Sequence, residues 1–432
     1  MRILITGATG FIGRHLVARL SGAGHTVVCC VRDVRRARQM FPALECRACD
    51  FNRDVSPDDW LPRLAGIDAV INCAGILQSR RAQAMVAIHR DAPAALFDAC
   101  ARTRVPRVIQ ISALGIGADI GTEYSRTKLE AERHLQTLDL DWLILRPSLA
   151  YTPAGSFGGT SLFRALAALP WIIPLVGDGK QSFQPIHMAD LAEAVRRLVE
   201  ERHASRQIID LVGPEPVAMR DILVALRGWL GFGSAHCLEI PLPLIGAIAR
   251  VADGFGGLGP ITSTSLTMLL AGNAADVSPF VAATGFEPRR FAGALAAEPA
   301  HVQDRWHARL YFLRPLLRVT IGLFFLCTGL FTFLFWPKAD SLALLRAAGL
   351  PEALLPLAYY CGWLFDVVLG IALLARWRVQ AVGVVMVAAC VFYLVFVTIA
   401  APTEWIYPIT PLGIVIPLMV AMLVMIAIED DR

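Results

Sequence analysis

The sequence predicts an α/β domain built on a doubly wound parallel sheet with a small substrate lobe, followed by an all-α bundle of four transmembrane helices. Three observations predict this. Short apolar runs alternate with helical patterns over the first 150 residues. A glycine-rich turn opens the alternation, and most of the surplus of apolar residues lies after residue 313. We expect residues 1–300 to form the first domain, with the lobe mainly within 150–300, and residues 301–432 to form the second.

Composition excludes some classes of function. The net charge is only +4, so nucleic-acid binding has no electrostatic support. Cys46 and Cys49 form a CxxC pair, but no second pair or nearby histidine completes a zinc site. We therefore expect these cysteines to pack in a strand, and we expect no metal site.

The first elements form a strand, a turn and a helix. Residues 2–6 (RILIT) are typical of a buried parallel strand, and 25–32 form the next strand. Gly7, Gly10 and Gly13 lie in the turn between the first strand and the helix. Such glycines allow a tight turn and close approach of a pyrophosphate to the helix N-terminus. The pattern predicts dinucleotide binding; the alternative is a glycine-rich turn in a non-binding domain.

The end of the second strand bears on the choice of cofactor. Arg32 ends this strand, and Arg35 and Arg36 follow closely. Guanidinium groups suit the 2′-phosphate of NADP. Asp33 is the competing feature, because a carboxylate here can bind the ribose of NAD. The sequence therefore favours NADP as the cofactor and leaves NAD as the alternative.

The alternation then continues through four strands and a helix. These elements are expected at 43–51, 66–75, about 85–103 (the helix), 107–112 and 141–147. Asp50 ends the third strand, at the sheet edge where the adenine is expected. Ala74 and Gly75 follow the fourth strand, where backbone must again pass near the cofactor.

Five short stretches carry a resemblance to a known family. "TGATGFIG", "NCAG", "ISALG", "YSRTK" and "LRPSLAY" stand in the order and spacing of the short-chain dehydrogenase/reductase superfamily, which has a Rossmann-type fold. The chain is most similar to the atypical, extended members that resemble the nucleotide-binding accessory subunit of respiratory complex I. The resemblance covers about residues 1–300.

The resemblance implies a catalytic role for Ser112, Tyr124 and Lys128. Residues four apart share a helix face, so Lys128 is expected beside Tyr124, lowering the pKa of its hydroxyl. Tyr124 could then donate a proton to a carbonyl as hydride arrives, or remove one from an alcohol. Ser112 would hydrogen-bond the substrate oxygen, and Lys128 would also hold the nicotinamide ribose.

Other interpretations of these residues remain open. Glu130 and Glu132 are also compatible with a solvated helix face that does no chemistry. Members similar to the complex I subunit can hold a nucleotide without turnover. His89 stands where related chains often carry Asn, and Asp190 is interpreted as a helix cap.

We expect the cofactor to contact residues from every turn at the carboxyl ends of the strands. These residues are Gly7, Thr9, Gly10, Phe11, Ile12, Gly13, Arg32, Asp50, Phe51, Ala74, Gly75, Tyr124, Lys128 and Pro147.

Residues 240–260 have an apolar face and little charge. Such a segment can lie on a membrane surface, form a lid, or be a buried helix of the lobe. The sequence leaves these three alternatives open.

The last third of the chain contains four apolar segments. They lie at about 315–336, 353–375, 379–401 and 407–428. Each is long enough to cross the roughly 30 Å core of a bilayer, and the region resembles DoxX-like four-helix membrane domains. Asp366 stands near the middle of the second segment, where it could relay protons, bind a quinone head group or make a structural polar contact.

The distribution of arginines predicts how the apolar segments are oriented in the membrane. One side of the segments carries Arg305, Arg309, Arg314, Arg318, Arg376 and Arg378, and the other carries only Lys338 and Arg346. Because Lys and Arg favour the cytoplasmic side, we expect a cell-membrane protein whose N-terminal domain and C-terminus are cytoplasmic.

Three functions remain, of which the third, a nucleotide sensor that signals redox state to the helical bundle, has no specific support in the sequence. The first is a membrane-anchored NAD(P)-dependent oxidoreductase acting by hydride transfer on a small lipophilic substrate, either a carbonyl or alcohol or a quinone-like molecule. The alternative is a non-catalytic, nucleotide-bound accessory or assembly factor of a respiratory-type membrane complex. The expected partners are the lipid bilayer, a lipophilic substrate and, in the second case, a membrane protein complex.

Overall fold

The computed structural model describes residues 1–77, 82–117, 119–201, 203–254, 261–347, 349–400, 402–405 and 411–429. The chain divides into two compact units, Met1–Ala308 and Arg309–Arg432. Each unit is described by itself below.

The first unit is built on a seven-stranded parallel sheet with the order β11-β6-β5-β4-β1-β2-β3. Its strands are β1 (Arg2–Thr6), β2 (Thr26–Val31), β3 (Glu45–Ala48), β4 (Ala69–Asn72), β5 (Val108–Ile111), β6 (Trp142–Pro147) and β11 (Gln207–Leu211). The six strands predicted before residue 150 are confirmed, and β3 forms the expected sheet edge. The order reverses at β1, between β4 and β2, which is where nucleotide sites form in such sheets.

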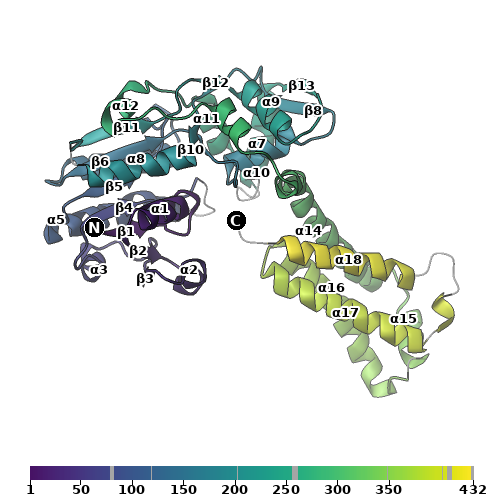
Figure 1. Cartoon of the computed structure of the whole chain (residues 1–432). Coiled ribbons are helices and arrows are strands. Elements are labelled where there is room, and N and C mark those ends of the chain that lie inside the picture. Colours follow the sequence, from purple (N-terminus) through teal and green to yellow (C-terminus); the bar gives the residue numbers. More distant parts are fainter. Residues whose placement is uncertain are drawn as a thin grey trace. The chain divides into compact units, whose positions relative to one another are not determined.

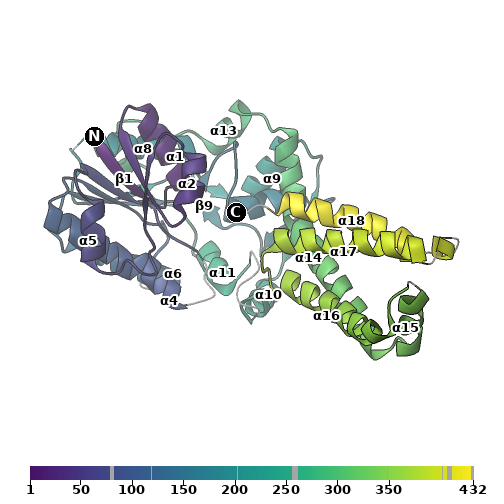
Figure 2. The same ribbon diagram turned by 90° about the horizontal axis from the view of Figure 1, so that it is seen from below.

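Helices cover both faces of this sheet (Figure 1, Figure 2). One core contains apolar residues of α1 (Phe11–Gly22), α2 (Val34–Met40), α8 (Met188–Glu200) and α12 (Ser278–Thr284). The opposite core contains residues of α3 (Pro57–Trp60), α5 (Ala92–Thr103) and α6 (Glu123–Gln136). Successive side chains of a strand point to opposite faces, so a strand covered on both sides must be apolar throughout. Ile3, Leu4 and Ile5 meet this requirement, and all three are fully buried.

The helix predicted at 85–103 is present with a local irregularity. Helix α4 (Ala82–Val86) runs through a π-helical turn, η2 (Ala87–Asp91), into α5. Such turns are often found at functional sites, and this one contains His89.

The segment after residue 150 is shared between the sheet and a lobe. Strand β11 and helices α8 and α12 return to the main sheet. The lobe contains β7 (Ala150–Tyr151), α7 (Gly159–Ala167), β8 (Ile172–Val176), β9 (Ser182–Phe183), β10 (Ile186–His187), β12 (Val217–Ala218), α9 (Met219–Trp229), β13 (His236–Ile240), α10 (Leu242–Gly254), α11 (Ser263–Leu270) and α13 (Phe291–Ala297). Its strands pair two by two, β10 with β7, β12 with β9 and β13 with β8.

The second unit is helical. Its helices are α14 (Val302–Leu334), which begins in the first unit, α15 (Lys338–Ala347), α16 (Leu355–Leu374), α17 (Val379–Ala400) and α18 (Pro411–Ile428). By length and composition, three described helical stretches can cross a membrane: Val302–Leu334, Glu352–Leu374 and Val379–Ile399. These overlap the first three predicted segments, each of which was predicted to end one or two residues later. The fourth corresponds to a shorter apolar helix, Leu412–Ile428, and the first residues of that prediction lie outside the described residues.

An ion-pair cluster joins both ends of this helical region. Glu429, just after α18, accepts a hydrogen bond from Nε of Arg314 at 2.8 Å and one from Arg318 at 3.3 Å. All three side chains are largely buried. The apolar part of α14 therefore starts where α18 ends.

Candidate active site

The predicted cofactor residues lie at the carboxyl ends of β1 to β6. Gly7 follows β1 with φ of +64°, and a Cβ atom there would be 3.0 Å from the carbonyl of Cys73. A Cβ atom on Gly13 would lie 2.2 Å from the Gly7 oxygen. Both positions therefore require glycine for clearance. Gly10 is the N-cap of α1, and among the described residues no side chain caps this helix. Its free N–H groups suit a pyrophosphate.

Asp33, the acidic residue that could bind the ribose of NAD, forms the N-terminal cap of a helix. Asp33 is the N-cap of α2, where its Oδ1 accepts a hydrogen bond from the backbone N–H of Arg36 at 3.0 Å. Arg32, the preceding residue, is exposed. At the end of β3, Asp50 accepts hydrogen bonds from the backbone and side chain of Asn52. One carboxylate oxygen of Asp33 is thus engaged in the cap, and Arg32 and Asp33 are both exposed at the end of β2.

Sequence reasoning missed a buried asparagine that fixes the turn after β4. Asn72 Oδ1 accepts hydrogen bonds from Thr6 Oγ1 at 2.5 Å and from the Ala74 N–H at 3.2 Å. Its Nδ2 donates to Gln110 Oε1 at 2.7 Å. Asn72 thus connects β1, β4 and β5 beside the Ala74–Gly75 turn. A polar residue ending an otherwise apolar strand was the available signal.

Two further predicted contacts lie after β3, at the sheet edge, and at the end of β6. The ring of Phe51 packs edge-on against Trp60 at a centroid distance of 5.4 Å, so only its backbone remains to meet a ligand. Pro147 ends β6, and its carbonyl accepts a hydrogen bond from the Leu114 N–H at 2.9 Å.

Helix α6 begins at the predicted catalytic pair. Thr122 caps it by accepting a hydrogen bond from the Ser125 N–H at 3.1 Å, which places Tyr124 in the first turn and Lys128 one turn later. Lys128 is buried, and its Nζ donates to the carbonyl oxygen of Ile111 at 3.2 Å. Lys128 thus reaches the end of β5.

The alternative of a solvated charged face is wrong for the inner side of α6. Glu132 is fully buried and accepts a hydrogen bond from Nε of Arg146 on β6 at 3.0 Å. Lys128 and Glu132, one turn apart, share this buried side. Glu130 lies at the rim, where Arg126 pairs with it.

The pKa values differ from the expectation. Burial raises the pKa of Tyr124 to about 12, so the predicted lowering by Lys128 is wrong in this structure. Burial also lowers the pKa of Lys128 to about 8, against an opposing effect of Glu132 and Cys73. Desolvation disfavours the charged form of each group and accounts for both directions. Both shifts favour the neutral form, so Tyr124 holds its proton more tightly than a free tyrosine.

Ser112 presents an unused hydroxyl in this region. Its N–H donates to the Leu145 oxygen at 2.7 Å, and its side chain is only 6% exposed. Its Oγ has no hydrogen-bond partner among the described residues. A buried hydroxyl without a partner is rare, and a substrate oxygen would satisfy it.

His89 is neutral and holds the loop after Gly75. Its Nε2 accepts a hydrogen bond from the Ile76 N–H at 3.0 Å, so the proton lies on Nδ1, which is 3.3 Å from Thr127 Oγ1. Burial, with a smaller effect of Lys128, lowers the pKa of His89 to about 3. Its ring packs edge-on against Tyr124 at 5.3 Å. His89 therefore positions Tyr124 and the loop.

Sequence reasoning also missed residues of the lobe. Phe157 stacks on Phe11 of the glycine-rich turn at a centroid distance of 6.0 Å. The Tyr151 hydroxyl is buried without a hydrogen-bond partner among the described residues. Both follow β6. Tyr151 ends the stretch LRPSLAY, to which sequence reasoning gave no role at this residue, and Phe157 lies outside the quoted stretches.

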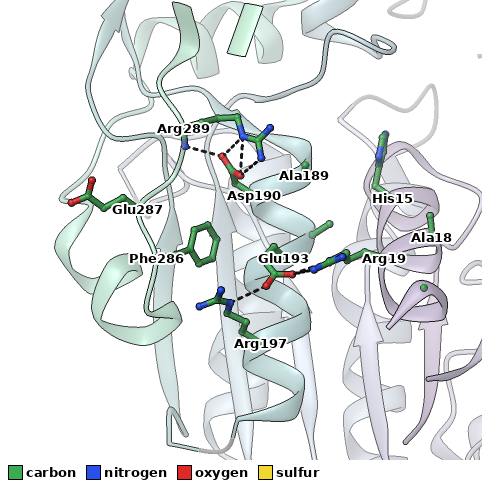
Figure 3. Close-up of a pocket in the computed structure, with 12 residues that line it drawn as sticks. His15, Ala18, Arg19, Ala189, Asp190, Glu193, Arg197, Phe286, Glu287 and Arg289 are labelled. Atoms are coloured by element: carbon green, nitrogen blue, oxygen red, sulfur yellow. Dashed lines mark hydrogen bonds and ion pairs between the residues drawn. The ribbon is translucent and has the colours of Figure 1, made fainter. Parts of the chain in front are cut away.

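The interpretation of Asp190 as a cap is wrong. His187 caps α8, because its Nδ1 accepts from the Ala189 N–H at 3.2 Å. Asp190 instead binds the backbone N–H and guanidinium of Arg289 at 2.9–3.1 Å (Figure 3). The adjoining cavity of about 770 Å³ is lined by residues of α1, α8 and 286–289, and by none of the predicted site residues. Ion pairs such as Arg19–Glu193 occupy its walls.

Comparisons with known proteins support the two halves separately. Residues 7–158 match the NAD(P)H-binding family model, and residues 322–423 match the DoxX-like family. Subunit 9 of the NADH dehydrogenase [ubiquinone] 1 alpha subcomplex of Rattus norvegicus is 27% identical over 265 residues, which are 59% of this chain and 67% of the relative. The ceramide reductase of Caulobacter vibrioides is 30% identical over 191 residues, 44% of this chain and 58% of the relative. The chain thus spans about three-fifths to two-thirds of these relatives.

Solved structures share the fold. A UDP-glucuronic acid 4-epimerase from Bacillus cereus, in complex with UDP-glucuronic acid and NAD, has a TM-score of 0.53 at 20% identity and covers 72% of this chain and all of its own. A nucleoside-diphosphate-sugar epimerase from Staphylococcus aureus has a TM-score of 0.56 at 17% identity, covering 68% of this chain and 99% of its own. These matches, the sheet order and the glycine turn show that the chain contains an NAD(P)-binding domain that is similar to short-chain dehydrogenases/reductases and to the complex I subunit, and a C-terminal DoxX-like domain with apolar helices.

Proposed function

We propose that the chain is a membrane-anchored oxidoreductase that uses NADP to transfer hydride to or from a lipophilic carbonyl, alcohol or quinone-like substrate. The observation that carries this proposal is the group of side chains at the end of β5. Ser112 offers a buried hydroxyl without a partner, Tyr124 is protonated, and Lys128 lies against the strand end.

Each of these residues has a separate role in the reduction of a carbonyl group. When bound, a reduced nicotinamide would supply the hydride to the carbonyl carbon. Ser112 hydrogen-bonds the carbonyl oxygen, and Tyr124 gives that oxygen its proton, which yields the alcohol. Lys128 hydrogen-bonds the nicotinamide ribose, and its charge then stabilises the tyrosinate until water returns the proton. His89 keeps the Tyr124 ring in place.

Two observations support a lipophilic substrate. The chain carries helices apolar and long enough to cross a membrane, which would hold the site near lipid. One relative at 30% identity is named a ceramide reductase.

A second function is favoured by a different observation. The chain is similar to an accessory subunit of complex I over 59% of its length. In that role, Arg32 and Lys128 hold the nucleotide as a structural element of a membrane complex, and Tyr124 performs no proton transfer.

We also propose that four helices span the cell membrane, with the N-terminal domain and the C-terminus cytoplasmic. The arginine-rich side of the spans supports this orientation. Cysteines introduced at Asp340 and Asp430, with Cys327 and Cys361 replaced by Ala, can be labelled from either side. Accessibility of position 430 only from outside would refute the proposal.

One experiment separates turnover from structural binding. The protein is purified with its native lipid, loaded with NADPH and mixed with candidate ketones, aldehydes and quinones. We expect NADPH fluorescence to fall in the wild type and to fall at least about a hundredfold more slowly in Tyr124→Phe, the range of a general acid. Catalysis is refuted if NADPH is never oxidised, or if Tyr124→Phe oxidises it equally fast.

A further inference from the structure

Helix α10 is not a buried helix of the lobe, so that alternative is wrong. Only Ile245 and Ala249 of this helix are buried. Leu244, Ile248 and Val251 are 54, 49 and 61% exposed. Three large aliphatic side chains of one short helix therefore face away from the protein.

The exposed side chains form a continuous stripe. Leu244, Ile248 and Val251 are spaced i, i+4 and i+7, which places them on one side of a helix; we call this stripe the α10 apolar face. The charged residues Arg250 and Asp253 project from other sides. A soluble protein covers such a face or leaves it for a partner.

Helix α10 adjoins the candidate active site through its neighbour. It packs against α11. On α11, Met268 accepts a hydrogen bond from the α6 cap Thr122 at 3.9 Å. Just after α11, Asn273 donates to the Leu114 carbonyl at 3.3 Å, two residues beyond Ser112. Helix α11 therefore borders the start of α6, and α10 packs against α11.

We propose that the α10 apolar face lies on the lipid bilayer, with Leu244, Ile248 and Val251 at the boundary between head groups and acyl chains. Features of the chain itself support lipid as the partner of this face. It carries helices apolar enough to span a membrane, and such a tether gives lipid a high effective concentration at the first unit. Aliphatic side chains without hydrogen-bonding groups suit acyl chains, and a flanking Arg250 suits phosphate head groups.

The proposed contact between α10 and lipid is a separate property from the proposed hydride transfer. If the proposed function holds, a lipophilic substrate can pass from the bilayer along α10 and α11 to Tyr124 without crossing bulk water. Binding of α10 to lipid does not depend on turnover, so the two proposals can fail separately.

Photocrosslinking of the full chain tests the contact. The amino acid p-benzoylphenylalanine replaces Ile248, or, as a matched control, Val224 of α9, which is 47% exposed. Each protein is reconstituted into vesicles of phosphatidylethanolamine and phosphatidylglycerol, irradiated and examined by mass spectrometry. We expect several-fold more phospholipid adduct from position 248 than from position 224. The Tyr124→Phe background should give the same ratio.

Two outcomes would overturn the proposal. Equal adduct yields at 248 and 224 would show that α10 does not meet lipid. Crosslinks from position 248 to a differently tagged copy, or to another protein, in place of lipid would show that the face is a protein interface.

Discussion

The Nζ atom of Lys128 lies against the backbone of Gly75. A Cβ atom on residue 75 would be 3.2 Å from Nζ and 3.6 Å from His89 Nε2. The glycine after β4 therefore does more than let the backbone approach a cofactor, because it also leaves room for the lysine that we expect to hold the nicotinamide ribose.

Gly75→Ala should weaken nucleotide binding more than it weakens the fold. The new methyl group must displace the end of a flexible side chain, which a protein tolerates, but Lys128 then loses its position. We expect roughly tenfold weaker NADPH binding, or about 1.4 kcal/mol, in a fluorescence titration. Gly22→Ala is the control, since nothing lies within 4 Å of its new Cβ atom. Equal affinities for the two variants would contradict the assignment.

Lys128→Met should stabilise the protein while removing its ribose contact. The pKa of Lys128 falls from 10.5 to about 8 on folding, so between these values the unfolded chain binds more protons. Wild-type stability must therefore rise with pH across this window and be lowest below pH 8. We expect Lys128→Met to gain roughly 1–3 kcal/mol at pH 7 and to lose the rise.

Thermal unfolding in detergent, at pH 7 and near pH 10, measures this effect. Lys180→Met is the control, because Lys180 is exposed and its substitution should change neither value. A Lys128→Met protein that unfolds earlier than the wild type at pH 7 would refute the reasoning.

The glycines of the first turn should differ in their tolerance of alanine. A Cβ atom would lie 2.2 Å from the Gly7 oxygen at Gly13 but 3.1 Å from it at Gly10. Because the neighbour is backbone, the clash at Gly13 needs a shift of α1, which costs about 1–3 kcal/mol. Thermal unfolding should show Gly13→Ala clearly less stable than Gly10→Ala. The reverse order would mean that α1 does not start as described.

Local sequence patterns predicted those elements whose structure is determined by nearby residues. The run Ile3-Leu4-Ile5 and the glycines behind it identify β1 and its turn, because burial on both faces and close approach leave few other residues possible. Strand β11 was not identified, because it joins β6 only after the whole of α8 has crossed the sheet. Its pairing is a long-range property of the topology.

The site was predictable in its residue types and not in its electrostatics. Ser112, Tyr124 and Lys128 lie at the expected strand end. The partner of Glu132 is Arg146 on another element, and a charged helix pattern cannot show which charges turn inward. The direction of the Tyr124 pKa depends on burial, which residue spacing does not reveal.

Arg32→Ala should discriminate between the two dinucleotides. With Asp33 engaged as the cap of α2, Arg32 is the exposed charge expected to meet a 2′-phosphate. We expect NADP binding to weaken by roughly tenfold or more, in the range of a charge-assisted hydrogen bond, and NAD binding to change little. Calorimetric titration of both nucleotides measures this. An equal loss for both would refute the 2′-phosphate assignment.

Two glycines of α16 should differ in their tolerance of alanine. A Cβ atom on Gly370 would lie 2.7 Å from the Leu326 nitrogen and 2.8 Å from the Gly322 oxygen of α14, both backbone atoms that cannot move aside. Close helix contact through glycine is a common way for membrane helices to associate. Gly370→Ala should therefore destabilise the second unit by about 1–3 kcal/mol. Gly362, on the same helix, has nothing within 4 Å of a new Cβ atom, so Gly362→Ala should be neutral or slightly stabilising, since alanine favours helix. Thermal unfolding in detergent compares the two. If both variants unfold with the wild type, α14 and α16 do not pack through Gly370.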